Sequence, residues 1–252
     1  MLIDLRFLTA GAIIFAAGSA LAGCKSAATS GTLGAVPRSA LCFTEGAPAR
    51  ADERGIRLEA GGVRAVIAGD RGGGNDRSAE IAFRYRGPSA FDAPLANGEL
   101  RRQIGLKLRA QDTCNVVYVM WHVAPKPGVA VSVKRNAGRS THAACGDGGY
   151  VNLTSEPGLA RAPLVTPDAP DDTNAGTPRL PHVLRADLDG HTLRVTADGI
   201  VVWRGELPPA AFEFDGPAGL RTDNGTFDVE LRVPNGGAAG SASAACEDRH
   251  GN

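Results

Sequence analysis

Short stretches in which apolar and polar residues alternate recur along most of the chain. Residues 79–86 place Ile81, Phe83 and Tyr85 on one side and charged residues on the other, and residues 103–109 repeat the pattern. A period of two residues is typical of a β-strand with one buried face. Further stretches of strand character lie at 56–60, 63–68, 115–123, 129–133, 150–153, 183–188, 192–196, 200–203 and 227–233. We therefore predict about eleven strands.

The strands differ in how they are expected to be buried. Residues 115–123 are apolar at nearly every position, which predicts a central strand buried on both faces. Residues 56–60 and 63–68 flank Gly61-Gly62, which predicts a hairpin. Beyond the first two dozen residues, no stretch has the periodicity of a three-turn helix. The pattern predicts an all-β fold, an antiparallel jelly-roll-like β-sandwich.

A proline-rich stretch, residues 155–181, interrupts the strand pattern. It is either a long surface loop or a disordered insert, and a domain boundary there would leave only a few strands behind it. We therefore predict one sandwich domain over residues 41–233 that includes this loop. Residues 234–252 begin with small residues and are expected to form a C-terminal tail.

Composition narrows the class of function. Lys and Arg together number 27, and Asp and Glu together also number 27, so the formal net charge is zero. A nucleic-acid-binding protein needs a basic surplus to displace counterions, and none is present here. Hydrophobic residues make up 43% of the chain, which suits one packed core and not a multi-pass membrane protein.

The amino terminus carries a targeting signal. Residues 7–22 are uncharged and apolar, but at ~1.5 Å per residue they are short for a bilayer core of ~30 Å. The run closes on Leu21-Ala22-Gly23-Cys24, which resembles the lipobox of bacterial lipoproteins. The resemblance implies removal of residues 1–23 and attachment of diacylglycerol and an acyl chain such as palmitate to Cys24. The alternative is an ordinary secretory signal in which Cys24 is incidental.

Lipidation sets the expected location. Two or three acyl chains hold a protein at a membrane durably, whereas a single chain does so only marginally. The resemblance implies a bacterial cell-envelope protein, and Lys25 after the cysteine implies the outer membrane. Residues 24–40 are small and polar and are expected to form a lipidated flexible tether.

With Cys24 assigned to lipid, four cysteines remain in an exported chain, where disulfides persist. Four cysteines allow three pairings, and sequence does not choose among them. We favour Cys114–Cys145, which joins neighbouring strands, and Cys42–Cys246, which joins the start of the domain to its tail. Metal binding is the alternative, but no C-x-x-C spacing supports it.

Residues 182–233 carry the most specific fold signal. Turns at Asp189-Gly190 and Asp198-Gly199 separate strands, and Ala218-Gly-Leu-Arg221 and Phe227-Asp228 follow. This order resembles the closing strands of concanavalin A-like lectin/glucanase and laminin G sandwiches. The resemblance implies the fold, which hosts sugar-binding modules, glucanases, lyases and protein-binding domains.

The catalytic and metal signatures of those families match poorly. Glucanases of this superfamily use Glu-x-Asp-x-x-Glu, and Glu213-Phe-Asp215-Gly-Pro-Ala218 lacks the second Glu, so no catalytic residue is assigned. Calcium is the one candidate cofactor, with Asp223, Asn224 and Asp228 as weak ligands in what is foremost a turn signal. We favour a protein without catalytic activity, but the sequence does not decide this.

One set of polar residues suggests a ligand-binding face. If Ile104, Leu106 and Leu108 face the core, the opposite side of the neighbouring strands carries polar, basic and aromatic side chains. Three of the four lysines lie between 107 and 134. Such a face can hold sugar hydroxyls or an acidic glycan, although solvated Lys and Arg would look the same in sequence. The candidate residues are Gln103, Lys107, Arg109, Tyr118, His122 and Lys134.

The sequence thus favours a lipid-anchored envelope protein whose sandwich binds carbohydrate or another envelope partner without catalysis. Two alternatives stay open. One is a polysaccharide-active glycoside hydrolase or lyase with a non-standard site, and the other is a structural or adhesive surface protein. The expected partners are the membrane, through Cys24, and a polysaccharide or an envelope protein, with no nucleic acid.

Overall fold

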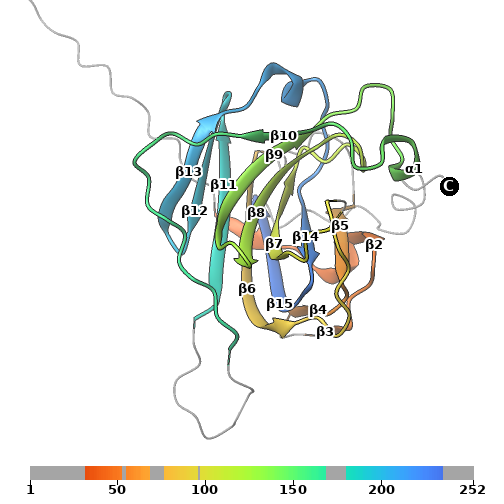
Figure 1. The fold of residues 1–252 in the computed structure, drawn as a ribbon, viewed down its shortest axis with the longest axis vertical. Coiled ribbons are helices and arrows are strands. Elements are labelled where there is room, and N and C mark those ends of the chain that lie inside the picture. The colour runs from red at the N-terminus through yellow and green to blue at the C-terminus, as the bar shows by residue number, and fades with distance from the viewer. Residues whose placement is uncertain (1–31, 53–54, 69–76, 96, 169–179, 235–252) are drawn as a thin grey trace, which may run out of the picture. The chain divides into compact units, whose positions relative to one another are not determined.

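The computed structural model describes residues 32–52, 55–68, 77–95, 97–168 and 180–234. These residues form two antiparallel sheets that pack as a jelly-roll-like β-sandwich (Figure 1). The predicted all-β sandwich is confirmed. Within the described ranges, helical structure is limited to α1 (His142–Cys145) and the 3-10 turns η1 (Arg38–Ala40) and η2 (Pro209–Phe212).

The first sheet has eight strands. In spatial order it contains β13 (Ile200–Glu206), β12 (Thr192–Ala197), β11 (His182–Asp189), β6 (Ser78–Pro88), β15 (Gly225–Pro234), β4 (Gly55–Leu58) and β3 (Arg50–Asp52). The eighth strand, β1 (Leu33–Ala35), pairs with β15. Strand pairing therefore begins inside the segment 24–40 that was expected to be a tether.

The second sheet has seven strands. In spatial order it contains β10 (Tyr150–Leu153), β9 (Gly128–Lys134), β8 (Val116–Ala124), β7 (Arg102–Leu108), β14 (Gly219–Asp223), β5 (Gly62–Ile67) and β2 (Leu41–Glu45). β8 lies between β7 and β9 and is buried on both sides, as its continuous apolar run predicted.

The main core lies between the sheets and is built from the inward residues of both. Phe83 of β6 contacts Trp121 of β8 with ring centroids 5.4 Å apart, edge to face. Phe227 of β15 lies 6.0 Å from Phe83 on the other side. Each alternating strand therefore turns its apolar side toward the opposite sheet, as the two-residue period requires.

The hairpin predicted for residues 56–68 is wrong. β4 belongs to the eight-stranded sheet and pairs with β3 and β15, whereas β5 belongs to the seven-stranded sheet and pairs with β2 and β14. Gly61 and Gly62 do allow the chain to turn. β4 and β5 both bury their apolar sides in the main core, one from each sheet. Two glycines indicate that the chain turns, but they do not show whether the two strands pair with each other or whether the chain crosses to the other sheet.

The described part of the proline-rich loop is held against the sandwich. The Glu156 amide donates to the Arg204 carbonyl at 2.7 Å, and the Asp168 amide donates to the Tyr85 carbonyl at 2.8 Å. Val165 between them is buried in the main core. Figure 1 shows this green segment after β10 running down beside β12 and β11. Residues 155–168 thus form a surface segment along the eight-stranded sheet, and residues 169–179 lie outside the described ranges.

The predicted Cys114–Cys145 disulfide is confirmed, with a sulfur–sulfur distance of 2.08 Å. Cys42 is buried on β2, but Cys246 lies outside the described residues, so their bridge stays a prediction. Residues 1–23 and Cys24 lie outside them as well, and lipidation also stays a prediction. Across the described ranges, no helix is both long and apolar enough to span a bilayer.

Candidate ligand-binding site

The strand register places the predicted site residues on one surface, the side of the seven-stranded sheet that points away from the main core. We call this surface the outer face. Cross-strand partners share a face of a sheet. One row of partners crosses the sheet through Cys42, Val66, Gly219, Lys107, Tyr118, Ser132 and Asn152. The next two rows contain Arg64, Arg221, Gly105 and Met120, and then Asp223, Gln103 and His122.

Five of the six predicted residues lie on the outer face: Gln103, Lys107, Tyr118, His122 and Lys134. Arg109 does not lie with them. It follows the end of β7 with φ of 50°, and its guanidinium donates to the carbonyls of Ala211, at 3.1 Å, and Phe214, at 2.7 Å. The strand ends at Leu108, so the alternation that assigned Arg109 to this side does not extend to it.

Aromatic rings and cations alternate at the β8–β10 end of the outer face. The rings of Tyr118 and Tyr150 stack with centroids 6.0 Å apart. The Arg221 guanidinium lies 5.1 Å from the Tyr118 ring, and the Lys134 ammonium lies 5.1 Å from the Tyr150 ring. Lys134 also donates to the Gly146 carbonyl at 2.7 Å. These cation–π contacts orient the positive charges along the face.

A buried carboxylate organises the middle of the outer face. Asp223 accepts hydrogen bonds from Gln103 Nε2 at 2.6 Å, Arg221 Nε at 2.8 Å and Arg64 Nη2 at 2.9 Å. Burial raises the pKa of Asp223, but the two guanidinium groups and the hydrogen bonds outweigh it, so the pKa is lowered. Asp223 is therefore held as an ion and is unsuited to donate a proton.

Lys107 is the unusual charge of the outer face. Its side chain is 2% exposed, and in the described part of the chain its ammonium has no hydrogen-bond or ion-pair partner. Burial, reinforced by repulsion from Arg64 and Arg221, lowers the pKa of Lys107 to about 7, although Glu45 and Asp112 act in the opposite direction. A buried ammonium without a partner is destabilising, so an anion beside it would be strongly favoured.

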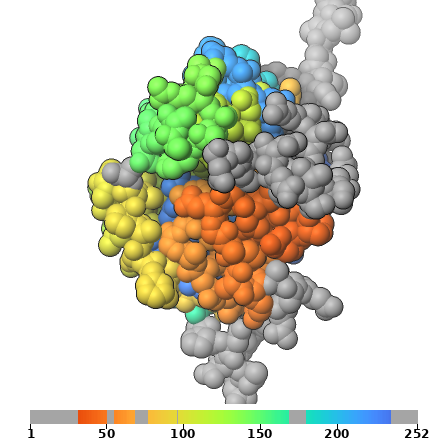
Figure 2. Space-filling view, turned by 90° about the vertical axis from the view of Figure 1, so that its right-hand side faces the viewer, coloured from red at the N-terminus to blue at the C-terminus, as the bar shows by residue number. Residues whose placement is uncertain are grey.

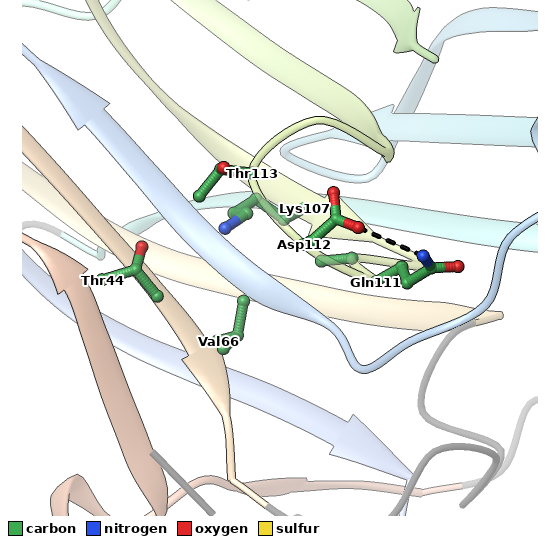
Figure 3. Close-up of a pocket in the computed structure, with 7 residues that line it drawn as sticks. Thr44, Val66, Lys107, Gln111, Asp112 and Thr113 are labelled. Carbon is green, nitrogen blue, oxygen red and sulfur yellow. Dashed lines mark hydrogen bonds between the residues drawn. The ribbon is translucent and has the colours of Figure 1, made fainter. Parts of the chain in front are cut away.

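A small hollow lies beside Lys107. Its lining consists of Thr44, Val66, Lys107, Ala110, Gln111, Asp112 and Thr113. Figure 3 shows the Lys107 amine between the side chains of Thr44 and Thr113. Asp112 accepts a hydrogen bond from Gln111 Nε2 at 3.1 Å, drawn as the dashed line. Hydroxyl, carboxylate and amine groups therefore line one small hollow.

Two more polar groups complete the face. Gln103 Oε1 is buried and has no hydrogen-bond partner in the described part of the chain, although its amide nitrogen binds Asp223. Burial, with repulsion from Arg101, lowers the pKa of His122 to about 4, so this imidazole is neutral at physiological pH. The outer face thus combines one acceptor and one cation that lack partners among the described residues with a pair of aromatic rings.

The middle of the outer face is buried, whereas Tyr150 at its β10 edge is 40% exposed. Lys107 and Lys134 are each 2% exposed, and Tyr118 is 5% exposed. Figure 2 looks at the side of the molecule where β2 and β5 (orange) and the segment around α1 (green) reach the surface. The described part of the proline-rich loop does not cover this face, because residues 155–168 follow the other sheet.

The weak calcium candidates are separated. Asp223 belongs to the outer face and binds arginines, whereas Asp228 lies on the eight-stranded sheet and accepts from Arg57 and Arg86 at 2.6 and 2.7 Å. The Asn224 side chain binds the backbone of Ala93. Among the described residues no group of three or more His, Cys, Asp or Glu side chains is placed to hold a metal ion.

Sequence reasoning missed three members of the site: Arg64, Arg221 and Tyr150. Arg64 and Arg221 occupy outward positions of strands whose alternation is visible in the sequence. Nothing local, however, indicates that β14 inserts between β5 and β7. Tyr150 lies on β10, whose pairing with β9 sets it beside Lys134. Only the order of strands in the sheet brings these residues to Lys107.

Comparison with known proteins shows similarity of structure alone. No family model matches the chain, and no curated protein matches it. Among solved structures, the carbohydrate-binding module CBM66 from Bacillus subtilis is similar, with 13% identity, a TM-score of 0.47, and coverage of 76% of this chain and 92% of that one. The GH16 endo-β-1,3(4)-glucanase SCLam has 13% identity and a TM-score of 0.35 over 68% of this chain and 62% of that one. The catalytic domain of a laminarinase from Thermotoga petrophila has 11% identity and a TM-score of 0.34, with 69% coverage of each chain. Similarity at this level indicates no function, so the function of this chain has to be inferred from its own residues.

Proposed function

We propose that this chain is a lipid-anchored cell-envelope protein whose β-sandwich binds an acidic carbohydrate through the outer face, without catalysis. The observation that carries the proposal is Lys107, a buried ammonium with no partner among the described residues, beside stacked tyrosine rings. A carboxylate or sulfate of a glycan would supply the missing counter-charge. The rings of Tyr118 and Tyr150 would pack against the apolar face of a sugar.

The desolvated ammonium of Lys107 favours an acidic ligand over a neutral one. Arg64, Arg221 and Lys107 contribute three positive charges; Asp223 binds the two arginines, Glu45 also pairs with Arg64 at 3.4 Å, and Asp112 lines the hollow beside Lys107. An anion next to Lys107 would stabilise its charged form and raise its pKa. Binding is therefore expected to weaken as pH rises through about 7, where the free protein loses the Lys107 proton.

Catalysis is a weaker hypothesis for this face. Most glycosidases need two carboxyl groups, one of which must hold a proton to donate. Asp223 is kept ionised by two arginines and is already bound by three donors. Release of reducing ends from acidic or neutral polysaccharides would support the hydrolase alternative. Eliminative cleavage, followed by absorbance of the new double bond, would support the lyase alternative.

The anchoring part of the proposal rests on the lipobox sequence. It predicts that radiolabelled palmitate enters the protein in bacterial cells, and that Cys24→Ser abolishes this incorporation. Incorporation into the Cys24→Ser variant would contradict it. Retention of the labelled wild type in the outer-membrane fraction would separate that location from the inner membrane.

The binding test is a glycan array followed by titration calorimetry at pH 6 and pH 8. Wild type is expected to bind uronic-acid or sulfated oligosaccharides, with at least tenfold weaker binding for Lys107→Met and for Tyr118→Ala. Lys126→Met is the matched control, because Lys126 is an exposed lysine in the turn after β8. No binding by wild type, or equal binding by Lys107→Met, would reject this site. Capture of an envelope protein, and of no glycan, would favour the adhesive alternative.

A further inference from the structure

The hollow beside Lys107 lies where one strand contributes no side chain to the outer face. The cross-strand neighbour of Lys107 on β14 is Gly219, and the neighbour of Gly219 on β5 is Val66. An added Cβ at Gly219 would lie 2.2 Å from the Ala65 carbonyl oxygen, so this position excludes a side chain. Lys107 and Val66 therefore line the same hollow across β14, together with Thr44 of β2.

The surroundings of the Lys107 amine are largely apolar. Val66 and Ala110 line the hollow and belong to an apolar cluster of the outer face whose members are at most 6% exposed. Asp112 lines it too, but its carboxylate already accepts hydrogen bonds from the Cys114 amide, at 2.7 Å, and from further donors of the same turn. Among the described residues it forms no ion pair with Lys107. The hollow thus holds a buried amine that is free to react.

We propose that Lys107 is a site of reversible modification by carbon dioxide, which converts its amine into a carbamate. The lone pair of Nζ attacks the carbon of carbon dioxide and forms an N–C bond, while the electrons of one C–O π bond move to the oxygen. One N–H proton passes to water. The product carries one negative charge, shared by its two oxygens, and the step needs no oxidant or reductant. Carbon dioxide is small and uncharged, which suits a small, largely apolar hollow.

Two arginines favour the product over the protonated amine. Arg64 of β5 and Arg221 of β14 repel the ammonium form of Lys107, and the same positive charges attract a carbamate at that position. Glu45 and Asp112 act in the opposite direction, but each acts less strongly than either arginine. A guanidinium group also matches the two oxygens of a carboxylate-like anion. Conversion of Lys107 from cation to anion therefore replaces a repulsion by an attraction.

The protonation state of Lys107 supports the same reaction, because an amine attacks carbon dioxide only when it holds no proton. Burial and the two arginines lower the pKa of Lys107 to about 7, so about nine in ten molecules carry the free amine at pH 8. A lysine with the ordinary pKa of about 10.4 is free in fewer than about one molecule in a hundred at that pH. The charged and titratable groups that face Lys107 are Arg64, Arg221, Glu45, Asp112 and, beside it on β8, Tyr118.

The test is carbon-13 NMR of the full chain in the presence of carbon-13-labelled bicarbonate at pH 8. We expect a carbamate resonance in wild type that is at least tenfold weaker in Lys107→Met and unchanged in Lys126→Met, the exposed-lysine control. At a fixed concentration of dissolved carbon dioxide, the resonance should grow at least fivefold between pH 6 and pH 8, because the amine loses its proton in this range. No carbamate resonance in wild type, or an equal one in Lys107→Met, would overturn the proposal.

If Lys107→Met does not fold, wild type decides. Alkylation with a trialkyloxonium ion converts carbamates into stable esters, which mass spectrometry of the peptides assigns to single lysines. At least tenfold more ester on Lys107 than on Lys126 supports the proposal, and equal amounts overturn it.

The modification does not depend on the proposed carbohydrate, and binding of acidic oligosaccharides to the same samples separates the two. A carbamate on Lys107 in a protein that binds no glycan would reject the proposed ligand and support the modification. Glycan binding by a protein that forms no carbamate would reject the modification alone. Where both occur, carbon dioxide should weaken glycan binding at least threefold, because the carbamate puts a negative charge where the acidic group binds.

Discussion

The two outward surfaces of the sandwich have similar alternating sequences and opposite physical character. On the eight-stranded sheet, charged residues pair with one another: Arg57 and Arg86 bind Asp228, and Arg232 binds Glu80. These side chains remain partly exposed. On the seven-stranded sheet several outward residues are buried, among them Tyr118, Lys134 and Lys107, and Lys107 lacks a partner among the described residues. A surface whose charged groups are paired and solvated needs no ligand. A surface that buries a charged group without a partner points to a binding site.

The largest expected contrast lies between the two aspartates that bind arginines. Asp223→Ala leaves Arg64 and Arg221 without their buried partner and is expected to lower the free energy of unfolding by about 3–5 kcal/mol. Asp228→Ala removes a partly exposed partner, and we expect a loss of about 1 kcal/mol. Urea unfolding of both variants measures the difference. Equal losses would show that the outer face is not desolvated as described.

The disulfide at the β8–β9 end is expected to have the next largest effect. Cys114 and Cys145 are 31 residues apart, and a loop of that length corresponds to about 3–4 kcal/mol of stabilisation through the unfolded chain. The double variant Cys114→Ser/Cys145→Ser should lose this amount in urea unfolding. It should also increase protease cleavage between residues 135 and 149. Cleavage unchanged from wild type would mean that other contacts hold this segment on the outer face.

Lys107 predicts a pH dependence that the eight-stranded sheet should lack. Its pKa is about 7 in the folded protein and near the ordinary 10.5 when unfolded. Between these values the unfolded chain holds a proton that the folded chain has released, so the free energy of unfolding rises with pH by up to about 1.4 kcal/mol per unit. Lys107→Met should remove this contribution between pH 7.5 and 9.5. The same slope in wild type and variant would contradict the burial of an unpaired amine.

The smallest effect is expected for the arginines of the eight-stranded sheet. Arg232→Ala removes ion pairs with Glu80 and Glu230 at a surface position. Such exposed pairs contribute about 0–1 kcal/mol, and salt weakens them further. Unfolding in low and high salt should show a small loss that fades with added salt. A loss above 2 kcal/mol would mean that this surface, too, is desolvated.

Much of the fold was predictable because alternation is a local property. The period of two residues located the long strands, and the continuous apolar run of residues 115–123 identified β8 as a strand buried on both sides. The same parity grouped Lys107, Tyr118 and Lys134 correctly, because neighbouring strands keep their register. It failed at Arg109, where the strand had already ended.

By itself, the sequence determined the strand segments, the inward and outward sides of each strand, and the Cys114–Cys145 pairing as the favoured choice. Only the tertiary structure decided that β4 and β5 lie in different sheets and that β14 inserts beside β7. It alone set Arg64 and Arg221 near Lys107 and bound Asp223 to both arginines. The physical reason is that alternation records which side of a strand faces the core, whereas desolvation of the other side depends on distant segments packed over it.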